Sequence, residues 1–379
     1  MTFFSYNSTG YLSRKFDLGG SKFRNLIWYL VYLIRKALNL ENSRIPNQIL
    51  KTKSITNSVA NSSKIETRNL LLPEEVNPLD SALDCLNANG FYPVSFATFE
   101  TMEFGVNSSR KKLLSSIVPG IPYSFDFEEE YYAEYMQSEY AFTFKKCGWD
   151  SFRNLEIISR GCIPLYLDAK GIPRYTMTFY PKRSMALIAE EFRKKPFKLS
   201  AESKDSFRKM CKSRLEYGYL YSYLNELIVL DSKEILFIDD SLDLRPDYLS
   251  LMLLNALAKE HKQKLFITKS YNYFFTDNTY ESEEFLYGRG FGYRGRLRGH
   301  NKDVNVLEGK DISQFSGVIF FGNVLRNWEK FIEISDTYGG PIVSVWGEDL
   351  APSRSQLREI QARSSHVFVR ELNHPFVIP

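Results

Sequence analysis

Runs of apolar residues alternate with helix-like stretches along the middle of the chain. The short run Ala141–Lys145, the helical stretch Phe152–Arg160 and the apolar run Ile163–Leu167 follow one another with tight loops between them. Parallel strands are buried on both faces and are joined by crossover helices, so this order is typical of a parallel α/β unit. We expect a helix within Glu128–Tyr140 before it and a strand within Gly90–Phe99, where the sequence reads FYPVSF.

A second series of the same kind starts at Glu234. The apolar run ILFID is followed by the helical stretch Tyr248–His261 and by the run KLFIT. The later elements are expected at Gly317–Phe321, Val324–Thr337 (a helix), Pro341–Trp346 and the closing run HVFVREL. Strands that alternate with helices in this way predict a second Rossmann-like domain. Its boundary is expected near Asp231–Lys233, after the aromatic helix Tyr217–Leu230.

The N-terminal part of the chain has a different pattern. Asn42–Asn69 is rich in Ser, Asn, Thr and Lys with little apolar periodicity, which predicts a linker or surface loop. Before it, Leu26–Ile34 is an apolar run with basic flanks, and its nine residues are fewer than the roughly 20 that span a bilayer. Residues 22–40 form either a helix packed on the protein or an interfacial helix on a membrane. The expected domains are an appendage at 1–70, a first α/β domain at 71–232 and a second at 233–379.

Composition narrows the class of protein. A chain of 379 residues with 44% apolar and 25% charged residues suits two globular domains and excludes a disordered or fibrous chain. The net charge of +4 favours anionic ligands. The basic stretch GRGFGYRGRLRG at 288–299 is one short patch, so no nucleic-acid partner is expected. The four cysteines lack a CxxC spacing, which argues against zinc and disulfides and for a cytoplasmic setting.

The segment from Tyr140 has the pattern of an anion site. A strand ends at Lys145 and Lys146, a glycine turn follows, and Asp150 or Ser151 could cap the next helix. The free N–H groups of a helix N-terminus and two nearby lysines attract anions such as a pyrophosphate.

Further along the same helix, Glu156 could accept hydrogen bonds from ribose hydroxyls, or it could lie on a solvated helix face. The lysines and Arg153 are equally compatible with ordinary surface charge. Gly161 is expected in a left-handed cap at the end of the helix. Pro164 is expected at the start of a strand or on an edge strand.

This segment also resembles a known family. Residues 145–164 read KKCGWDSFRNLEIISRGCIP, which is similar to the donor-domain signature of exostosin-like, GT-B glycosyltransferases of viruses and phages, and residues 172–182, IPRYTMTFYPK, continue the resemblance. Cys147 departs from it, because the family more often has a second glycine there. The resemblance implies that Glu156 binds the donor ribose, that residues 148–153 approach its phosphates and that residues 161–164 shape the base pocket. The implied donor-binding residues are Lys145, Lys146, Gly148, Trp149, Asp150, Arg153, Glu156, Gly161, Cys162 and Pro164.

The second domain resembles the acceptor-side domain of the same family. The similar elements are FLYGRGFGYRG with Gly288 and Gly290, the strand end at Gly322, the WGED turn, and VFVREL with Arg370. In a conventional GT-B enzyme this domain comes first, so the chain is either circularly permuted or a section of a longer array. The expected fold is therefore α/β, with two Rossmann-like domains, mainly parallel sheets and a swapped order.

The resemblance implies that the chain transfers a sugar from a nucleotide-sugar to a glycan or glycoprotein acceptor, without a metal or other cofactor. It would act in the cytoplasm or at a membrane surface, of a host cell if the protein is viral. An inverting enzyme needs a base for the acceptor hydroxyl. Asp349, Glu348 and Asp240 are the candidates, although each could be a turn carboxylate or a helix cap. A retaining enzyme could dispense with this base, so the stereochemistry stays open.

Three other functions remain open. Asp239, Asp240 and Asp243 in FIDDSLD could form the divalent-metal site of a GT-A glycosyltransferase. The C-terminal runs WGEDL and VFVREL loosely resemble polysaccharide pyruvyl transferases, whose donor is phosphoenolpyruvate. The chain could also be a nucleotide- or glycan-binding module without catalysis. The sequence leaves the sugar, the base of the nucleotide, the acceptor and the oligomeric state undetermined.

Overall fold

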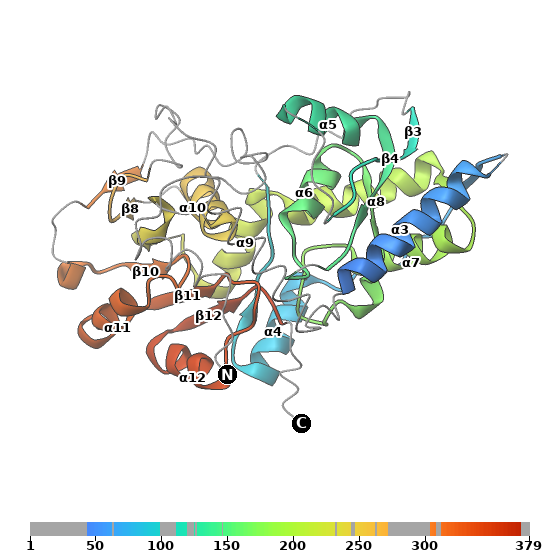
Figure 1. Ribbon diagram of the computed structural model, residues 1–379. Coiled ribbons are helices and arrows are strands. Elements are labelled where there is room, and N and C mark those ends of the chain that lie inside the picture. The colour runs from blue at the N-terminus through green and yellow to red at the C-terminus, as the bar shows by residue number, and fades with distance from the viewer. Residues whose placement is uncertain are drawn as a thin grey trace, which may run out of the picture. The chain divides into compact units, whose positions relative to one another are not determined.

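The computed structural model describes residues 44–62, 64–98, 111–119, 125, 127–145, 147–231, 233–243, 247–261, 264–271, 304–307 and 312–372. Every strand pairing in these ranges is parallel, and helices alternate with the strands (Figure 1). This confirms the expected α/β fold with parallel, Rossmann-like sheets. The chain divides into two compact units, Met1–Lys51 and Thr52–Pro379. The apolar run Leu26–Ile34 lies outside the described residues.

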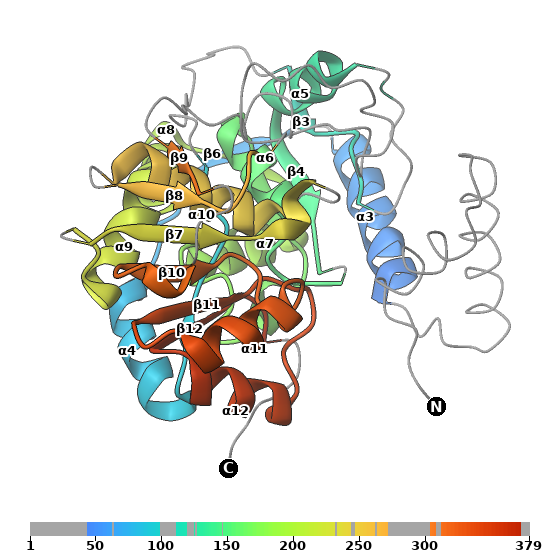
Figure 2. The same cartoon turned by 90° about the vertical axis from the view of Figure 1, so that its left-hand side faces the viewer.

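A seven-stranded sheet, here called the large sheet, has the strand order β2-β12-β11-β10-β7-β8-β9 (Figure 2). Its strands are β2 (Tyr92–Pro93), β7 (Ile235–Ile238), β8 (Leu265–Ile267), β9 (Val304–Val306), β10 (Val318–Phe321), β11 (Ile342–Trp346) and β12 (His366–Val369). Numbered from β7, the strands from β9 to β12 follow the Rossmann order 3-2-1-4-5-6. The direction of winding therefore reverses between β7 and β10, and such a switch point is where ligands bind in these sheets.

Helices cover both faces of the large sheet. One face packs against α4 (Pro78–Asn89), α11 (Trp328–Thr337) and α12 (Arg354–Arg363) in a shared apolar core. On the other face, Tyr223 of α9 (Tyr217–Ile228) meets the ring of Phe368 in β12.

Gly322, at the end of β10, is required by a close approach on that second face. A Cβ there would lie 2.2 Å from Ser250 Oγ of α10 (Tyr248–Glu260) and 2.4 Å from the ring of Phe237. α10 can therefore approach the sheet at this point only because residue 322 has no side chain.

The large sheet also contains a segment from the first half of the chain. Tyr92 and Pro93 of β2 pair with Phe368 and Val369 of β12, and Cys85 and Phe91 belong to the apolar core. Residues 78–93 fall within the domain expected at 71–232, yet they complete the sheet of the domain expected at 233–379. The pattern FYPVSF predicts a strand, but parallel pairing joins distant segments and the sequence does not reveal the partner.

A three-stranded sheet, here called the small sheet, contains the segment that resembles a donor domain. Its strands β3 (Lys112–Leu114), β4 (Ser138–Thr143) and β5 (Ile163–Tyr166) are joined in order through α5 (Glu128–Met136) and α6 (Phe152–Ser159). This confirms the parallel α/β unit that the sequence predicts. Pro164 lies in the edge strand β5, and Gly161 has the left-handed φ of 67° expected after the helix.

A separate two-stranded sheet is formed by segments on either side of the small sheet in the chain. β1 (Glu66–Arg68) pairs with β6 (Phe197–Leu199), and α7 (Lys182–Lys194) and α8 (Ala201–Leu215) flank β6 in the chain. The Glu75 carboxylate accepts hydrogen bonds from the N–H groups of Arg183 (3.1 Å) and Ser184 (2.7 Å) in the first turn of α7. A distant segment thus supplies the acceptor that this helix N-terminus needs.

The predicted loop at Asn42–Asn69 is wrong for most of its length. Residues Arg44–Ala60 form the helix α3, and among residues 48–60 its less exposed positions are 48, 49, 52, 55 and 59. These positions have helical spacing, but two of them, Gln48 and Thr52, are polar, so the apolar periodicity is hidden. In the ranges that the structure describes, no helix combines the length and apolarity needed to cross a bilayer.

Candidate functional site

Polar residues gather where the strands of the large sheet end. Because parallel strands all end at one edge, the residues that follow β7, β10, β11 and β12 share this carboxyl edge. They include the acids Asp239, Asp240, Glu348, Asp349 and Glu371 and the bases Arg326 and Arg370. We take this edge as the candidate functional site.

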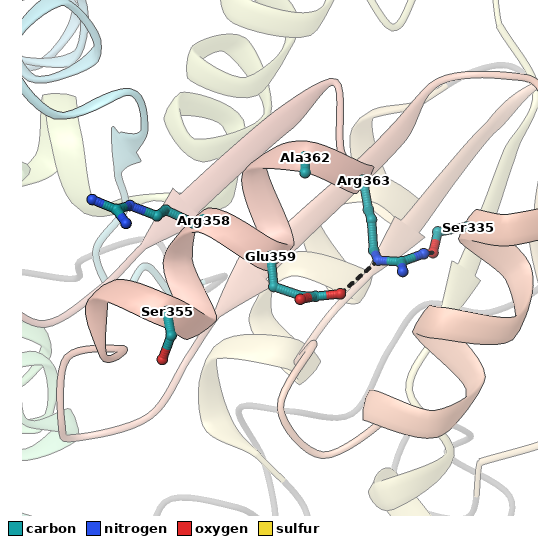
Figure 3. A pocket seen from close by; sticks show the side chains of 6 residues that line it. All are labelled: Ser335, Ser355, Arg358, Glu359, Ala362 and Arg363. Atoms are coloured by element: carbon teal, nitrogen blue, oxygen red, sulfur yellow. Dashed lines mark hydrogen bonds and ion pairs between the residues drawn. The ribbon is translucent and has the colours of Figure 1, made fainter.

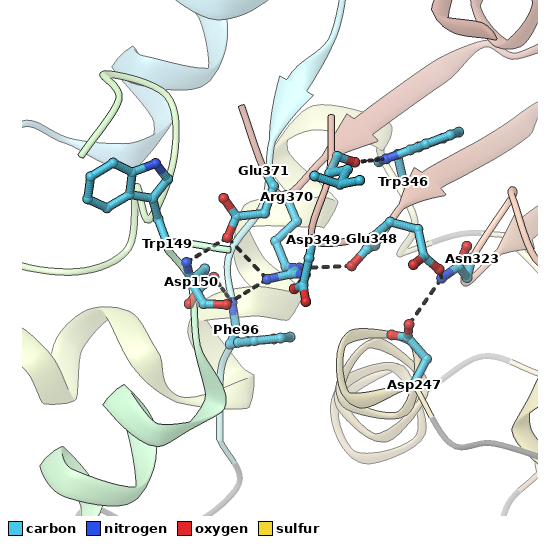
Figure 4. Close-up of polar contacts among 12 residues, drawn as sticks. Phe96, Trp149, Asp150, Asp247, Asn323, Trp346, Glu348, Asp349, Arg370 and Glu371 are labelled. Carbon is cyan, nitrogen blue, oxygen red and sulfur yellow. Dashed lines mark hydrogen bonds and ion pairs between the residues drawn. The ribbon is translucent and has the colours of Figure 1, made fainter. Parts of the chain in front are cut away.

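Arg370, directly after β12, is the centre of the first group, which we call the Arg370 cluster (Asp150, Asp349, Arg370 and Glu371; Figure 4). Its side chain is 3% exposed. Nε donates to the carbonyl of Gly347 (2.9 Å), and Nη2 donates to the Asp349 carboxylate (2.6 Å). Nη1 donates to the carbonyl of Asp150 (2.6 Å), which belongs to the segment that resembles a donor site. One guanidinium therefore connects the large sheet to the small sheet.

Glu371 and Asp150 strengthen this connection. The Glu371 carboxylate accepts a hydrogen bond from the N–H of Asp150 (2.6 Å), and the Asp150 carboxylate accepts one from the N–H of Phe96 (2.8 Å). The expected capping of α6 by Asp150 or Ser151 is therefore wrong. Ser151 occupies the N-cap position without a side-chain capping bond, while the Asp150 carboxylate is directed to Phe96, beyond β2.

Burial sets the electrostatics of this cluster. It raises the pKa of Glu371 to about 7 and that of Asp150 to about 6, against the opposing effect of Arg370. One guanidinium faces three carboxyl groups, and Asp150 and Glu371 are both buried. Desolvation penalises the charged form of such groups, so the pair binds a proton close to neutral pH.

Gly148 lies against the same cluster. A Cβ at this position would be 2.5 Å from Glu371 Oε1 and 3.0 Å from Asp349 Oδ1. The resemblance predicts that this segment approaches phosphates, but two carboxylates face Gly148 itself. Carboxylates repel a phosphate and accept hydrogen bonds from hydroxyl groups, so the surroundings of Gly148 suit a hydroxyl-bearing ligand better.

Trp149 anchors the loop between β4 and α6. Its buried ring stacks on Tyr166 of β5 at a centroid distance of 6.3 Å, and its carbonyl accepts a hydrogen bond from the Tyr166 hydroxyl (2.8 Å). The Lys145 ammonium lies 4.9 Å from the centroid of the Trp149 ring. These contacts hold Lys145 beside the loop in which the resemblance places the donor phosphates.

Arg326 is the centre of a second group, the Arg326 cluster (Asp247, Asn323, Arg326 and Glu348). Figure 4 shows three of its members, Asp247, Asn323 and Glu348. Arg326 Nε donates to Glu348 (2.9 Å), and Nη2 pairs with Asp247 (3.3 Å). Asn323 Nδ2 donates to the same two carboxylates. Glu348, which follows β11, is thus held by residues of the turn after β10.

The remaining acidic residues lie at the switch point. Asp239 is buried, and its carboxylate accepts hydrogen bonds from Ser241 and Asn327. Asp240 accepts one from Thr268 Oγ1 (3.0 Å) and pairs with Lys330 (2.9 Å). Across the described ranges, no three His, Cys, Asp or Glu side chains gather as metal ligands would.

Glu156 lies in the helical layer of the small sheet. Its side chain is 5% exposed and accepts a hydrogen bond from the Tyr131 hydroxyl of α5 (2.9 Å). It is therefore not on a solvated helix face, which was the alternative interpretation. Arg153 of the same helix is half-buried, and Cys162 is buried in the apolar cluster with Tyr131.

Other predicted site residues lie outside the described residues, namely Lys146, Gly288 and Gly290. Among those described, the structure brings Gly148 and Asp150 together with Asp349 and Arg370. Sequence reasoning missed Glu371, although it directly follows Arg370, because the run VFVREL contains no sign that its carboxylate meets residue 150.

An open hollow lies elsewhere, between α11 and α12 (Figure 3). Its lining residues are Ser335, Ser355, Arg358, Glu359, Ala362 and Arg363. Ser335 and Arg363 lie near the helix ends that lead into β11 and β12, so the hollow extends toward the amino edge of the large sheet. Arg363 pairs there with Glu359 at 2.9 Å, an exposed ion pair of little energetic weight.

Comparison with known proteins gives no relative for this arrangement. No protein-family model, curated protein or solved structure matches the chain. Its function is therefore argued from the site itself and from the resemblance of residues 145–164.

Proposed function

We propose that this protein is a glycosyltransferase that moves a sugar from a nucleotide-sugar donor to a glycan or glycoprotein acceptor without a metal ion. The observation that carries the proposal is the position of Asp349 beside Gly148. It brings a carboxylate from the carboxyl edge of the large sheet to the loop that resembles a donor site. An inverting glycosyl transfer needs a base for the acceptor hydroxyl next to the bound sugar donor.

Residues 145–164 have the chemistry of a donor site. Lys145, Lys146 and Arg153 would balance the charge of the diphosphate, and the N-terminus of α6 would add its partial positive charge. Glu156 already accepts a hydrogen bond from a hydroxyl group, that of Tyr131. A ribose hydroxyl can donate the same kind of hydrogen bond to a carboxylate, so we assign donor-ribose binding to Glu156.

Asp349 is the best placed of the three candidate bases. Its side chain is 55% exposed, whereas that of Glu348 is 17% exposed and held by Arg326 and Asn323. Asp240 lies at the switch point and is paired with Lys330. In the inverting reaction, the acceptor oxygen bonds to the anomeric carbon while its proton passes to Asp349. The bond from that carbon to the nucleoside diphosphate breaks, and its electron pair leaves with the diphosphate.

A panel of UDP-, GDP- and CDP-sugars tests this proposal. A nucleotide that binds the folded protein raises its melting temperature by mass action, and slow hydrolysis of the bound donor then reports the transfer chemistry. We expect hydrolysis to persist in EDTA and to fall at least 100-fold in Asp349→Asn, because general base catalysis is typically worth about 10²–10⁴-fold. Binding without turnover would instead support a binding module, and activity restored only by manganese would support a metal site at Asp239, Asp240 and Asp243.

A further inference from the structure

Arg370 has a function beyond linking the two sheets. We infer that it is a positioning residue, which holds the Asp349 carboxylate beside Gly148 and so sets the place of the base relative to the donor. This inference rests on the proposed function, because it assigns to Arg370 a part in the same reaction.

The hydrogen bonds of Arg370 reach each part of the chain that must be aligned. Two of its nitrogens bond to the turn after β11, at Gly347 and Asp349, and the third bonds to Asp150 of the donor-like loop. A guanidinium is planar and its donors have fixed directions. The position of Asp349 is therefore tied geometrically to the carbonyl of Asp150, although the Asp349 side chain is largely exposed.

The surroundings keep Arg370 itself in place. Its guanidinium carbon lies 4.7 Å from the centroid of the Phe96 ring, and Nη1 also pairs with Glu371 (3.3 Å). Phe96 in turn donates its N–H to Asp150, so the ring that packs on Arg370 is fixed by the same loop. A lysine would keep the charge but would lose this forked geometry.

The test is a double-mutant cycle of Arg370→Lys with Asp349→Asn, measured as kcat and KM for whichever UDP-, GDP- or CDP-sugar the parent protein hydrolyses. We expect Arg370→Lys to lower kcat about 10- to 100-fold, with KM for the donor within about 3-fold, since the misplaced group acts in the chemical step. In the Asp349→Asn background the same change should cost less than about 2-fold, because a residue that acts through Asp349 has nothing left to position.

Arg363→Lys is the matched control, because Arg363 is also ion-paired but lies toward the other edge of the large sheet. It should leave kcat unchanged. The inference would be overturned if the effects of Arg370→Lys and Asp349→Asn on kcat multiplied in the double variant, or if Arg370→Lys left kcat unchanged. Either result would leave the proposed function intact. A fall in kcat that only follows a loss of folded protein, measured by thermal melting, would also overturn it. If the parent protein hydrolyses none of the donors, the proposed function fails and the inference fails with it.

Discussion

Gly148 lies against two carboxylates, those of Glu371 and Asp349, so a larger residue at position 148 would meet them. A Cβ at 2.5 Å from Glu371 Oε1 would force the loop or the Arg370 cluster to move. We predict that Gly148→Ala weakens donor turnover at least 10-fold, since a small displacement of reacting groups is costly. Gly339→Ala is the control, because a Cβ there meets nothing within 4 Å and should change neither turnover nor melting temperature. Normal turnover in Gly148→Ala would show that this contact is unimportant for the reaction.

The raised pKa of Glu371 predicts how the free energy of unfolding depends on pH. Burial raises its pKa from the ordinary 4.5 to about 7, so the folded state binds its proton more tightly than the unfolded state does. Its contribution to the free energy of unfolding is complete below about pH 4.5 and is lost as the pH rises through about 7. Asp150, with its pKa raised to about 6, acts in the same direction.

Glu371→Gln should therefore flatten this slope, because glutamine cannot ionise and its amide oxygen can still accept from Asp150. Urea unfolding between pH 5 and pH 8 measures the effect, which is on the order of 3 kcal/mol at most for a shift of this size. An equally steep loss of stability in the variant and the parent protein would show that Glu371 does not titrate in this range.

At the scale of elements, hydrophobic patterning predicted β4, β5, β7, β8, β10, β11 and β12 and several of the helices between them, because burial and periodicity are local properties of the sequence. It did not predict the short strands β3 and β9 or the helices α4 and α12. It failed where a contact from a distant segment decides the structure. α3 was missed because Gln48 and Thr52 replace apolar residues among its less exposed positions. The hydrogen bond from the Phe96 N–H to the Asp150 carboxylate was not predicted, because Phe96 follows β2 and lies far from Asp150 in the sequence.

The N-terminus of α7 shows the same dependence on distant contacts. Glu75 accepts hydrogen bonds from Arg183 and Ser184 in the first turn, so Glu75→Ala should lower the free energy of unfolding by about 1–3 kcal/mol. Glu75→Gln should lose less, because one oxygen can still accept. Chemical denaturation measures both variants against Glu74→Ala, whose side chain is exposed. Equal stabilities for Glu74→Ala and Glu75→Ala would exclude this capping role.

At the scale of the whole molecule, residues from Thr52 onward form one compact unit. In this unit β2 pairs with β12 in the large sheet, and α4 contributes Cys85 to the apolar core packed on that sheet. The domain boundary expected at 232/233 cuts through this arrangement. A fragment of residues 233–379 would lack Cys85, Phe91 and the strand beside β12, and would expose apolar surface.

We therefore expect residues 64–379 to unfold cooperatively in urea, whereas residues 233–379 should show no cooperative transition. Circular dichroism and amide chemical-shift dispersion distinguish the two outcomes. A cooperative transition of the shorter fragment would mean that the large sheet does not require β2 and α4.

The donor site is the central claim, and the affinity of Glu156 variants for nucleotide tests it most directly. Charged hydrogen bonds are worth about 1.5–3 kcal/mol, so Glu156→Ala should weaken binding of the donor nucleotide roughly 10- to 150-fold. Glu156→Gln should lose less, and Tyr131→Phe, which removes only the hydroxyl that occupies the carboxylate in this structure, should retain binding. Isothermal titration with UDP and GDP gives the affinities. Unchanged affinity of Glu156→Ala for the nucleotide that binds the parent protein would contradict the assignment of residues 145–164 as the donor site.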